Sequence, residues 1–413
     1  MNRGLSKWKI THLGDCAALI KDTVSPSDLG DLPYVGLEHI GENTLSLIGH
    51  GSADDVISPK TRFRKGDILF GKLRPYFRKV IRAPFDGICS TDIWVIRAKN
   101  GVEPEYLFYC MASRSLIEFA SSASEGTRMP RAKWDYVSTY RLPIPPLSER
   151  RSIARTLGAL DDKIKLNCCM NETLEEMARA LFKSWFVDFD PVRAKMEGRD
   201  PYLPSELWNL FPDALNEEGN PAGWKISPLG EWVEILDSKR IPLSSRERKQ
   251  RQGSYPYHGA TGVMDHVDAF LFEGVHVLLG EDGSVVKPNG KPFTQYVWDQ
   301  FWVNNHAQVL RGKGISNETL LCFLQQTDIA PYVTGAVQPK LNQKSLKAIP
   351  FLASGCSDTL AAFGRVVGPL FEQFRRNSEE SRTLAQTRDL LLPKFTLGQT
   401  RFQDAEKVTE VAA

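Results

Sequence analysis

Two long stretches with the same heptad spacing of apolar residues constrain the fold of this chain more than any other feature. Such spacing, alternating between three and four positions, is typical of a helix that packs along one face. The first stretch has Ile153, Leu157, Leu160, Ile164, Asn167, Asn171, Leu174, Ala178, Leu181 and Trp185 at its seam positions. The pattern returns 210 residues later in Phe363, Val367, Leu370, Phe374, Asn377, Ser381, Leu384, Arg388 and Leu391.

The equal length and phase of the two stretches favour helices that pack on each other, although each could instead pack on its own globular domain. We expect an antiparallel pair, in which Asn167 faces Ser381 and Asn171 faces Asn377 in a buried polar layer that fixes the register. These polar residues could also face solvent or a partner subunit. The predicted interface comprises Ile153, Leu157, Leu160, Ile164, Asn167, Asn171, Leu174, Leu181, Val367, Leu370, Phe374, Asn377, Ser381, Leu384 and Leu391.

Short motifs outside these stretches also recur in the same order. Trp8-Lys9-Ile10 returns as Trp224-Lys225-Ile226, and Pro33-Tyr34-x-Gly36 returns as Pro256-Tyr257-x-Gly259. Gly126-x-x-x-Pro130-Arg131 resembles Gly335-x-x-x-Pro339-Lys340. Repeated order at a nearly constant offset indicates a duplicated module. The expected fold is therefore mixed α+β, with two domains in tandem separated by an antiparallel pair of long helices.

The predicted boundaries follow from these repeats and from the turn-forming residues between them. Two globular domains cover 1–146 and 223–355, long helices cover 147–186 and 356–392, an ordered proline-rich connector covers 187–222, and a tail covers 393–413. Within the domains we expect strands at 68–73, 92–97, 276–279 and 307–310, and helices at 105–120 and 317–327. Because Gly368 and Pro369 interrupt the second long helix, it should either bend there or begin its regular part at Pro369.

Composition and cysteine usage limit the class of protein. The 413 residues carry a net charge of only +2, so a nucleic-acid signal must be local. No apolar run approaches 18 residues, and the start of the chain does not resemble a signal peptide. Seven cysteines without a C-x-x-C motif are typical of reduced thiols in a cytoplasmic protein. We therefore expect a cytoplasmic location, with no disulfide frame and no metal site.

Motifs for common catalytic chemistry are missing from the sequence. There is no phosphate-binding G-x-x-x-x-G-K-[ST] loop, no H-E-x-x-H zinc motif, and no N/D-P-P-Y/F tetrapeptide of an amino-methyltransferase. Together these absences favour a binding protein without catalytic residues. A nuclease with an unrecognised site, or a scaffold that does not bind DNA, remain the alternatives.

Clusters of basic residues suggest where nucleic acid binds. Residues 60–82 hold nine lysines and arginines against one acidic residue, interleaved with aromatic residues, and a second cluster follows residue 239. Cations beside aromatic side chains suit phosphate contacts and base reading, although a solvated loop face has the same composition. The candidates for DNA contact are Lys72, Arg74, Arg78, Lys79, Arg128, Arg131, Arg246, Arg248, Lys249, Lys287 and Lys340.

Several longer segments resemble the specificity subunits of type I restriction–modification systems. They are Leu-Pro-Ile-Pro-Pro-Leu-Ser-Glu-Arg at 142–150, Leu-Phe-Lys-Ser-Trp-Phe-Val-Asp-Phe-Asp-Pro-Val-Arg at 181–193, Asp-Ile-Leu-Phe-Gly-Lys-Leu-Arg-Pro at 67–75 and Leu-Leu-Leu-Pro-Lys at 390–394. The resemblance covers nearly the whole chain. It implies two target-recognition domains, each reading one half of a split, asymmetric site in double-stranded DNA.

The resemblance also implies partners and cofactors. The paired helices would dock two methyltransferase subunits, which hold S-adenosylmethionine, and restriction subunits that use ATP and Mg²⁺ would join that core. No cofactor is expected in this chain, and no membrane contact. A helix of about 39 residues is roughly 58 Å long, more than one DNA turn, which favours a bipartite target with an unread spacer.

Overall fold

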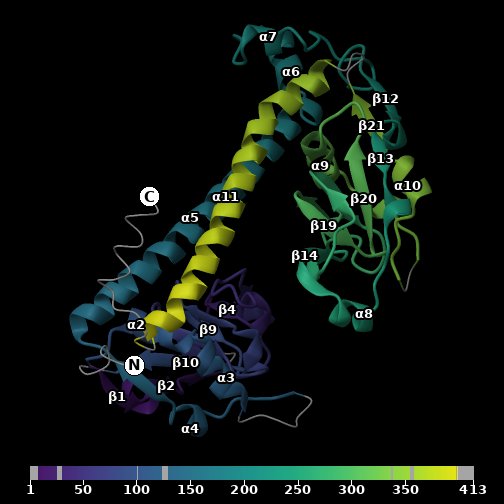
Figure 1. Ribbon diagram of the computed structural model, residues 1–413. Coiled ribbons are helices and arrows are strands. Elements are labelled where there is room, and N and C mark those ends of the chain that lie inside the picture. The colour runs from purple at the N-terminus through teal and green to yellow at the C-terminus, as the bar shows by residue number, and fades with distance from the viewer. Residues whose placement is uncertain are drawn as a thin grey trace, which may run out of the picture. The chain divides into compact units, whose positions relative to one another are not determined.

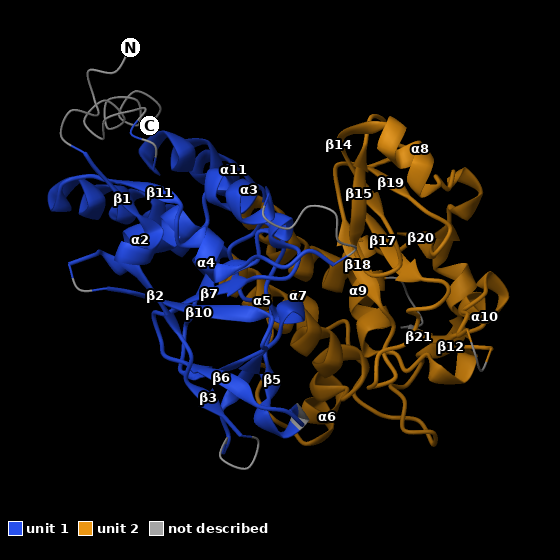
Figure 2. Ribbon diagram, turned by 90° about the horizontal axis from the view of Figure 1, so that it is seen from below, with its two compact units in different colours: residues 1–167, 379–413 blue, residues 168–378 orange. Residues whose placement is uncertain are grey.

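The computed structural model describes residues 8–25, 30–99, 101–122, 129–335, 338–353, 358–396 and 398. Two long helices, α5 (Leu147–Phe186) and α11 (Asp358–Thr396), stand out from the mixed sheets and short helices (Figure 1). The chain divides into two compact units, which Figure 2 colours separately. Unit 1 comprises Met1–Asn167 with Glu379–Ala413, and unit 2 comprises Cys168–Ser378. Each unit therefore contains one globular module and about half of each long helix.

The module of unit 1 is built on an antiparallel four-stranded sheet in the order β2 (Ala17–Ile20), β10 (Ile93–Ala98), β7 (Ile68–Gly71), β8 (Val80–Arg82). A five-stranded sheet has the order β3 (Thr23–Val24), β6 (Lys60–Phe63), β9 (Gly87–Cys89), β4 (Pro33–Val35), β5 (Gly51–Ser52), and β1 (Lys9–His12) pairs with β11 (Arg141–Ile144). The helices are α1 (Leu13–Cys16), α2 (Pro104–Met111), α3 (Arg114–Ser122) and α4 (Trp134–Val137), with 3₁₀ turns η3 (Leu37–His39), η4 (Ala53–Asp55) and η5 (Pro75–Phe77).

The module of unit 2 repeats this plan. Its antiparallel sheet has the order β13 (Val233–Ile235), β20 (Ala307–Gly312), β17 (His276–Gly280), β18 (Thr294–Val297), and β12 (Lys225–Pro228) pairs with β21 (Pro350–Ala353). A further sheet has the order β15 (Val263–Val267), β14 (Gln252–His258), β19 (Gln300–Val303), β16 (Phe272–Glu273). The helices are α8 (Ser245–Gln250), α9 (Asn317–Gln326) and α10 (Gln343–Lys347), with η6 (Leu229–Glu231), η7 (Asp237–Lys239) and η8 (Ala330–Tyr332).

The two modules share a parallel strand pair at the position of the repeated Pro-Tyr-x-Gly motif. Tyr34 of β4 lies opposite Ile88 of β9, and Tyr257 of β14 lies opposite Trp302 of β19. With the matching strand orders of the four-stranded sheets, this register confirms that the sequence repeats mark a duplicated fold in tandem.

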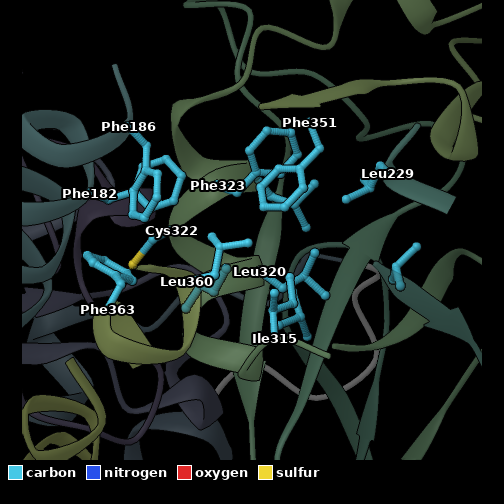
Figure 3. Close-up of a cluster of buried hydrophobic side chains, with 14 of the residues drawn as sticks. Phe182, Phe186, Leu229, Ile315, Leu320, Cys322, Phe323, Phe351, Leu360 and Phe363 are labelled. Atoms are coloured by element: carbon cyan, nitrogen blue, oxygen red, sulfur yellow. The ribbon is translucent and has the colours of Figure 1, made fainter. Parts of the chain in front are cut away.

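Each hydrophobic core joins a module to parts of both long helices. In unit 1, Ile153 and Leu157 of α5 belong to one cluster with Leu392 and Phe395 of α11. In unit 2, Phe182 and Phe186 of α5 and Phe363 of α11 surround Cys322 of α9, with Phe323 and Phe351 beside them (Figure 3). Strands β7 and β17 are buried along their whole length, as expected of central apolar strands.

The connector between the first long helix and the second module is ordered, as predicted. It contains α6 (Asp190–Met196) and α7 (Ser205–Trp208). Phe189, Val192 and Phe211 are buried in the unit 2 core, and the rings of Trp185 and Phe211 lie 5.1 Å apart. Among all the described residues, no helix combines the length and hydropathy required to cross a lipid bilayer.

Three sequence predictions need correction. The helix expected at 105–120 is two helices, because the chain turns at Ser113, whose hydroxyl donates to the Cys110 carbonyl at 2.7 Å. Of the two alternatives for the second long helix, a bend at Gly368 and Pro369 or a regular part that begins at Pro369, the second is wrong, because the helix runs from Asp358 through Pro369. It also ends at Thr396 and not at 392. Pro369 and Pro393, which both lie inside α11, each remove one backbone hydrogen bond, but buried apolar side chains flank both prolines and hold the helix together.

Candidate nucleic-acid interface

The loop between β7 and β8 of unit 1, residues 72–79, is the centre of the first basic cluster, and we call it the basic loop. It contains η5, and Arg74 and Arg78 on either side of η5 have left-handed backbone angles, with φ of 51° and 50°. The Lys72 amide donates to the Asp92 carbonyl at 2.9 Å, and the Arg74 amide donates to the Pro130 carbonyl at 2.8 Å. Such conformations are uncommon for residues with a β-carbon and persist only where surrounding contacts hold them.

Two of the predicted DNA contacts in this loop are instead structural. Arg78 is 2% exposed; its Nε donates to the Ala112 carbonyl at 2.7 Å, and its two terminal nitrogens reach the Asp389 carboxylate at 3.0 and 3.1 Å. Lys79 donates to the Leu37 carbonyl at 2.8 Å and lies 3.7 Å from Glu42. The expectation that Arg78 contacts DNA is therefore wrong, because its guanidinium is buried and already bound.

Three other candidates, Lys72, Arg74 and Arg131, lie on adjoining backbone segments. Lys72 and Arg74 are half-buried, and neither forms an ion pair within the described part of the chain. A β-bridge between Leu73 and Arg131 brings Arg131 beside them, where its Nε lies 3.1 Å from Asp92 and 53% of its side chain is exposed. Arg128, also a candidate, lies outside the described residues.

The equivalent loop of unit 2 begins with carboxylates. After β17, Glu281 and Asp282 occupy the place that the basic loop takes after β7, and a bridge between Asp282 and Lys340 matches the one between Leu73 and Arg131. Lys340 lies 3.5 Å from Glu281, which Arg240 also contacts at 2.8 Å. The second module therefore has Glu281 where the first has Lys72, and both of its carboxylates contact basic side chains of unit 2, Glu281 with Arg240 and Lys340 and Asp282 with His306.

The second predicted cluster separates into exposed and structural residues. Arg246 and Lys249 are exposed on α8. Arg248 lies 5.1 Å from the ring centre of Tyr257 and 3.1 Å from Asp265, so it stabilises the module. Lys287 is exposed on the β17–β18 loop, where its ammonium lies 5.6 Å from the ring centre of Phe293.

The long helices run antiparallel within each unit. In unit 1, Asp161 of α5 lies 2.7 Å from Arg388 of α11. Lys163 of α5 lies 3.2 Å from Glu380 of α11, and the Asn167 amide donates a hydrogen bond of 2.8 Å to the same Glu380. Residue numbers therefore rise along one helix as they fall along the other. Glu380 is the neighbour of Ser381, the residue predicted to face Asn167.

In unit 2, Asn377 donates a hydrogen bond of 2.9 Å to Asn171, as predicted, and Asn171 donates to Ser378 at 2.9 Å. The rings of Phe182 and Phe363 lie 5.5 Å apart. Among the predicted seam residues, those buried are Ile153, Leu157, Asn167, Val367 and Asn377, and those half-buried are Leu160, Ile164, Asn171, Leu174, Leu181, Leu370, Phe374, Ser381, Leu384 and Leu391.

Arg388 has a role that the sequence pattern did not reveal. It is 1% exposed and binds Asp161 at 2.7 Å and Asp389 at 3.1 Å. Burial opposes the charge of Arg388, but Asp161 and then Asp389 outweigh it and raise the pKa of the guanidinium. Burial likewise favours the neutral Asp389 carboxyl, yet Arg78 and then Arg388 lower its pKa below the ordinary value. The only signal in the sequence was an arginine at a seam position that holds alanine in the first helix.

No group of three or more histidine, cysteine, aspartate or glutamate side chains in the described segments is placed to hold a metal ion. Each unit carries basic surface residues on its module and an antiparallel section of the helix pair.

Comparison with known proteins identifies the family to which this chain is similar. The family model described as the type I restriction modification DNA specificity domain matches residues 6–176 and 221–352. The MjaIX type I restriction enzyme specificity subunit of Methanocaldococcus jannaschii is 26% identical over 400 residues, covering 92% of this chain and 87% of that protein. The HindI specificity subunit of Haemophilus influenzae is 26% identical over 470 residues, covering 96% and 100%.

The crystal structure of the type I restriction-modification S subunit from M. genitalium has the same fold, with a TM-score of 0.52 at 16% identity, covering 96% of this chain and 98% of that one. The family model covers most of the chain in two tandem segments, and each segment contains one of the duplicated modules described above. The chain therefore belongs to the type I restriction–modification DNA specificity family.

Proposed function

We propose that the two modules of this specificity subunit read the two halves of a bipartite, asymmetric DNA site, one module to each half-site. The observation that carries the proposal is the duplication of one fold with different side chains at equivalent loops. Lys72 and Arg74 follow β7 in unit 1, whereas Glu281 and Asp282 follow β17 in unit 2. Both loops adjoin the same part of the fold, through matching β-bridges.

The chemistry of these residues supports different half-sites. Lysine and arginine donate hydrogen bonds to the O6 and N7 atoms of guanine and to phosphates, whereas aspartate and glutamate accept a hydrogen bond from the N4 amino group of cytosine. Loops with such different side chains at equivalent places would not favour the same bases. An asymmetric target is the expected consequence, because a duplicated fold with identical side chains would favour two similar half-sites.

We further propose that the antiparallel helices α5 and α11 hold two methyltransferase subunits, which restriction subunits then join. S-adenosylmethionine, ATP and Mg²⁺ would bind in those partners, and this chain would supply recognition and assembly without catalysis. Support comes from the family membership and from the repeated pattern of the helices. Each of the two units contains an antiparallel section of the helix pair, so each could offer a similar surface to one methyltransferase subunit.

Co-expression with the methyltransferase subunit of its own system, followed by genome-wide mapping of methyladenine, tests the proposal. We expect a methylated motif with two different specified parts and an unspecified spacer between them. A continuous or symmetric motif would contradict the assignment of one module to each half-site.

Two further measurements test the alternatives, which are a nuclease with an unrecognised site and a scaffold that does not bind DNA. The purified chain should not cut DNA in the presence of Mg²⁺, and cleavage by the chain alone would show that it is an enzyme. In an electrophoretic mobility-shift assay, the complex of this chain with its methyltransferase subunits should bind a labelled duplex that carries the motif at a concentration at which a scrambled duplex stays unbound. A complex that assembles but binds neither duplex would show a scaffold without DNA recognition.

A further inference from the structure

We propose that Arg78, Asp389, Arg388 and Asp161 form a positioning network that orients the basic loop of unit 1 for reading its half-site. This inference rests on the proposed function of the module. The four residues lie on three segments that are distant in sequence, the basic loop, α5 and α11, and Tyr109 of α2 also contacts Asp161. All four residues belong to unit 1.

The first link holds the end of the basic loop. Arg78 directly follows η5 and has a left-handed backbone, so the turn depends on its surroundings. Its guanidinium makes a two-pronged contact with Asp389 of α11, at 3.0 and 3.1 Å, while Nε donates to the Ala112 carbonyl at 2.7 Å. A two-pronged contact fixes both the position and the orientation of the planar group.

The second link holds Asp389 itself. Arg388 contacts Asp389 at 3.1 Å and Asp161 of α5 at 2.7 Å, and the Tyr109 hydroxyl of α2 donates to Asp161 at 2.7 Å. The two arginines and two aspartates balance in charge, although Arg78 and Arg388 are almost completely buried. Because a buried charge that loses its partner is costly, the four groups hold one another in a single arrangement.

This arrangement fixes one end of the loop and uses neither Lys72 nor Arg74. Within the basic loop, Arg78 and Lys79 bind protein groups, whereas Lys72 and Arg74 form no ion pair among the residues that the structure describes. Arg74 also has a left-handed backbone. Base reading requires donors within a narrow range of position, so a loop that relaxes would lose discrimination before it loses binding.

Unit 2 uses different residues where its module meets α11, which provides a matched control. There Arg375 of α11 lies 3.6 Å from Glu318 of α9, and the Tyr296 hydroxyl donates to Glu318 at 2.7 Å. At the α5 position equivalent to Arg388, unit 2 has Ala178. A substitution at Glu318 therefore disturbs the attachment of the other module without touching the network of unit 1.

The test uses the complex of the full chain with its methyltransferase subunits and DNA duplexes in which one half-site at a time is altered. For Asp389→Asn we expect discrimination at one half-site to fall about tenfold, with the other half-site unchanged. The affected half-site should be the one that loses discrimination in the double variant Lys72→Ala and Arg74→Ala. Glu318→Gln should leave discrimination at that half-site as in the wild type.

Graded variants separate positioning from folding. Arg78→Lys keeps the charge but loses the two-pronged contact, so its discrimination should lie between that of the wild type and Asp389→Asn. Should Asp389→Asn fail to assemble, Arg78→Lys and Asp389→Glu provide the same measurement. An equal loss at both half-sites, or none in any of these variants, would overturn the network. A wild-type complex that selects no bipartite site would instead overturn the proposed function.

Discussion

The side-chain amide of Asn377 donates a hydrogen bond of 2.9 Å to the side-chain oxygen of Asn171, between the two long helices of unit 2. Both side chains have further partners: Gln373 donates to Asn377 at 2.7 Å, and Asn171 donates to Ser378 at 2.9 Å. A polar pair at a helix seam costs stability compared with apolar packing, but it favours the one register in which both amides find partners.

Replacing one member of this pair should lower the free energy of unfolding more than replacing both members. Asn377→Leu leaves the oxygen of Asn171 without its partner, so we expect the free energy of unfolding to fall by about 1–3 kcal/mol. The double variant Asn171→Leu and Asn377→Leu creates an apolar seam and should be more stable than the single variant. Urea denaturation measures both, with Arg376→Leu at an exposed position as the control. A double variant no more stable than Asn377→Leu would contradict the role of the pair.

Two buried histidines should make the stability of unit 2 depend on pH. Burial lowers the pKa of His258 and of His276, although hydrogen bonds to Gln295 and to the Gly274 carbonyl oppose the shift. Because both folded pKa values lie below the unfolded value of about 6.5, the unfolded chain binds more protons near pH 6. The contribution of these two histidines to the free energy of unfolding is therefore fully present above about pH 6.5, and it is lost as the pH falls toward their folded pKa values.

Urea midpoints measured between pH 5 and pH 8 test this dependence. The double variant His258→Gln and His276→Gln should show a weaker decline toward pH 5 than the wild type. Val303→Ala removes buried apolar atoms from the same module without changing a titratable group. Val303→Ala should lower the urea midpoint at every pH and should not change how steeply the midpoint declines between pH 8 and pH 5. Equal slopes in the wild type and the double histidine variant would show that these histidines do not cause the dependence.

The long helices and the duplication could be predicted from sequence because both are recorded in local patterns. The heptad spacing around Leu157 and Val367 follows from the side chains that one helix face buries. The antiparallel register followed from one further assumption, that the central polar positions meet, and the contact between Asn171 and Asn377 agrees with it. The repeated Pro-Tyr-x-Gly motif similarly marks one strand pair in both modules.

The roles of individual arginines could not be predicted in this way. Arg78 lies in a run of cations, and nothing in that run separates it from Arg74. Its partner Asp389 is 311 residues away, so only the tertiary fold shows that Arg78 is buried. Arg388 interrupts the apolar seam in the sequence, but the pattern does not reveal Asp161 as its partner. Local patterns report periodic burial, whereas ion pairs depend on which segments meet.

The continuous path of α11 through Pro369 leads to a third prediction. Proline has no amide hydrogen, so the Arg365 carbonyl lacks its usual helical donor, and Pro369 itself is exposed. Pro369→Ala restores that hydrogen bond without removing buried atoms, and should raise the free energy of unfolding by roughly 2 kcal/mol. Glu372→Ala, also exposed on α11, should change it by less than about 0.5 kcal/mol. A Pro369→Ala variant no more stable than the wild type in urea would show that the helix tolerates the proline without cost.

Among the residues that the structure describes, Lys72 and Arg74 of the basic loop have no ion-pair partner. If Lys72 contacts a phosphate and Arg74 reads a base, the double variant Lys72→Ala and Arg74→Ala removes one phosphate contact. The slope of log affinity against log salt should then become shallower by about 0.9, whereas phosphate contacts by both residues would make it shallower by about 1.8. Lys79→Ala is the matched control in the same loop, because the Lys79 ammonium already binds the Leu37 carbonyl. Its slope should equal that of the wild type.

Measuring the DNA affinity of the same variants with duplexes of different sequence distinguishes phosphate contacts from base contacts. A phosphate contact weakens binding to every duplex by a similar factor, whereas a base contact weakens binding mainly to the cognate half-site. Because Arg74 has the restrained backbone and Lys72 the flexible side chain, we expect Arg74→Ala alone to reduce discrimination and Lys72→Ala alone to change mainly the salt slope. Titrations of both single variants against duplexes altered in one half-site measure this difference. If neither the slope nor the discrimination changes in any of the three variants, the basic loop does not contact DNA, and the recognition surface of unit 1 lies elsewhere on the module.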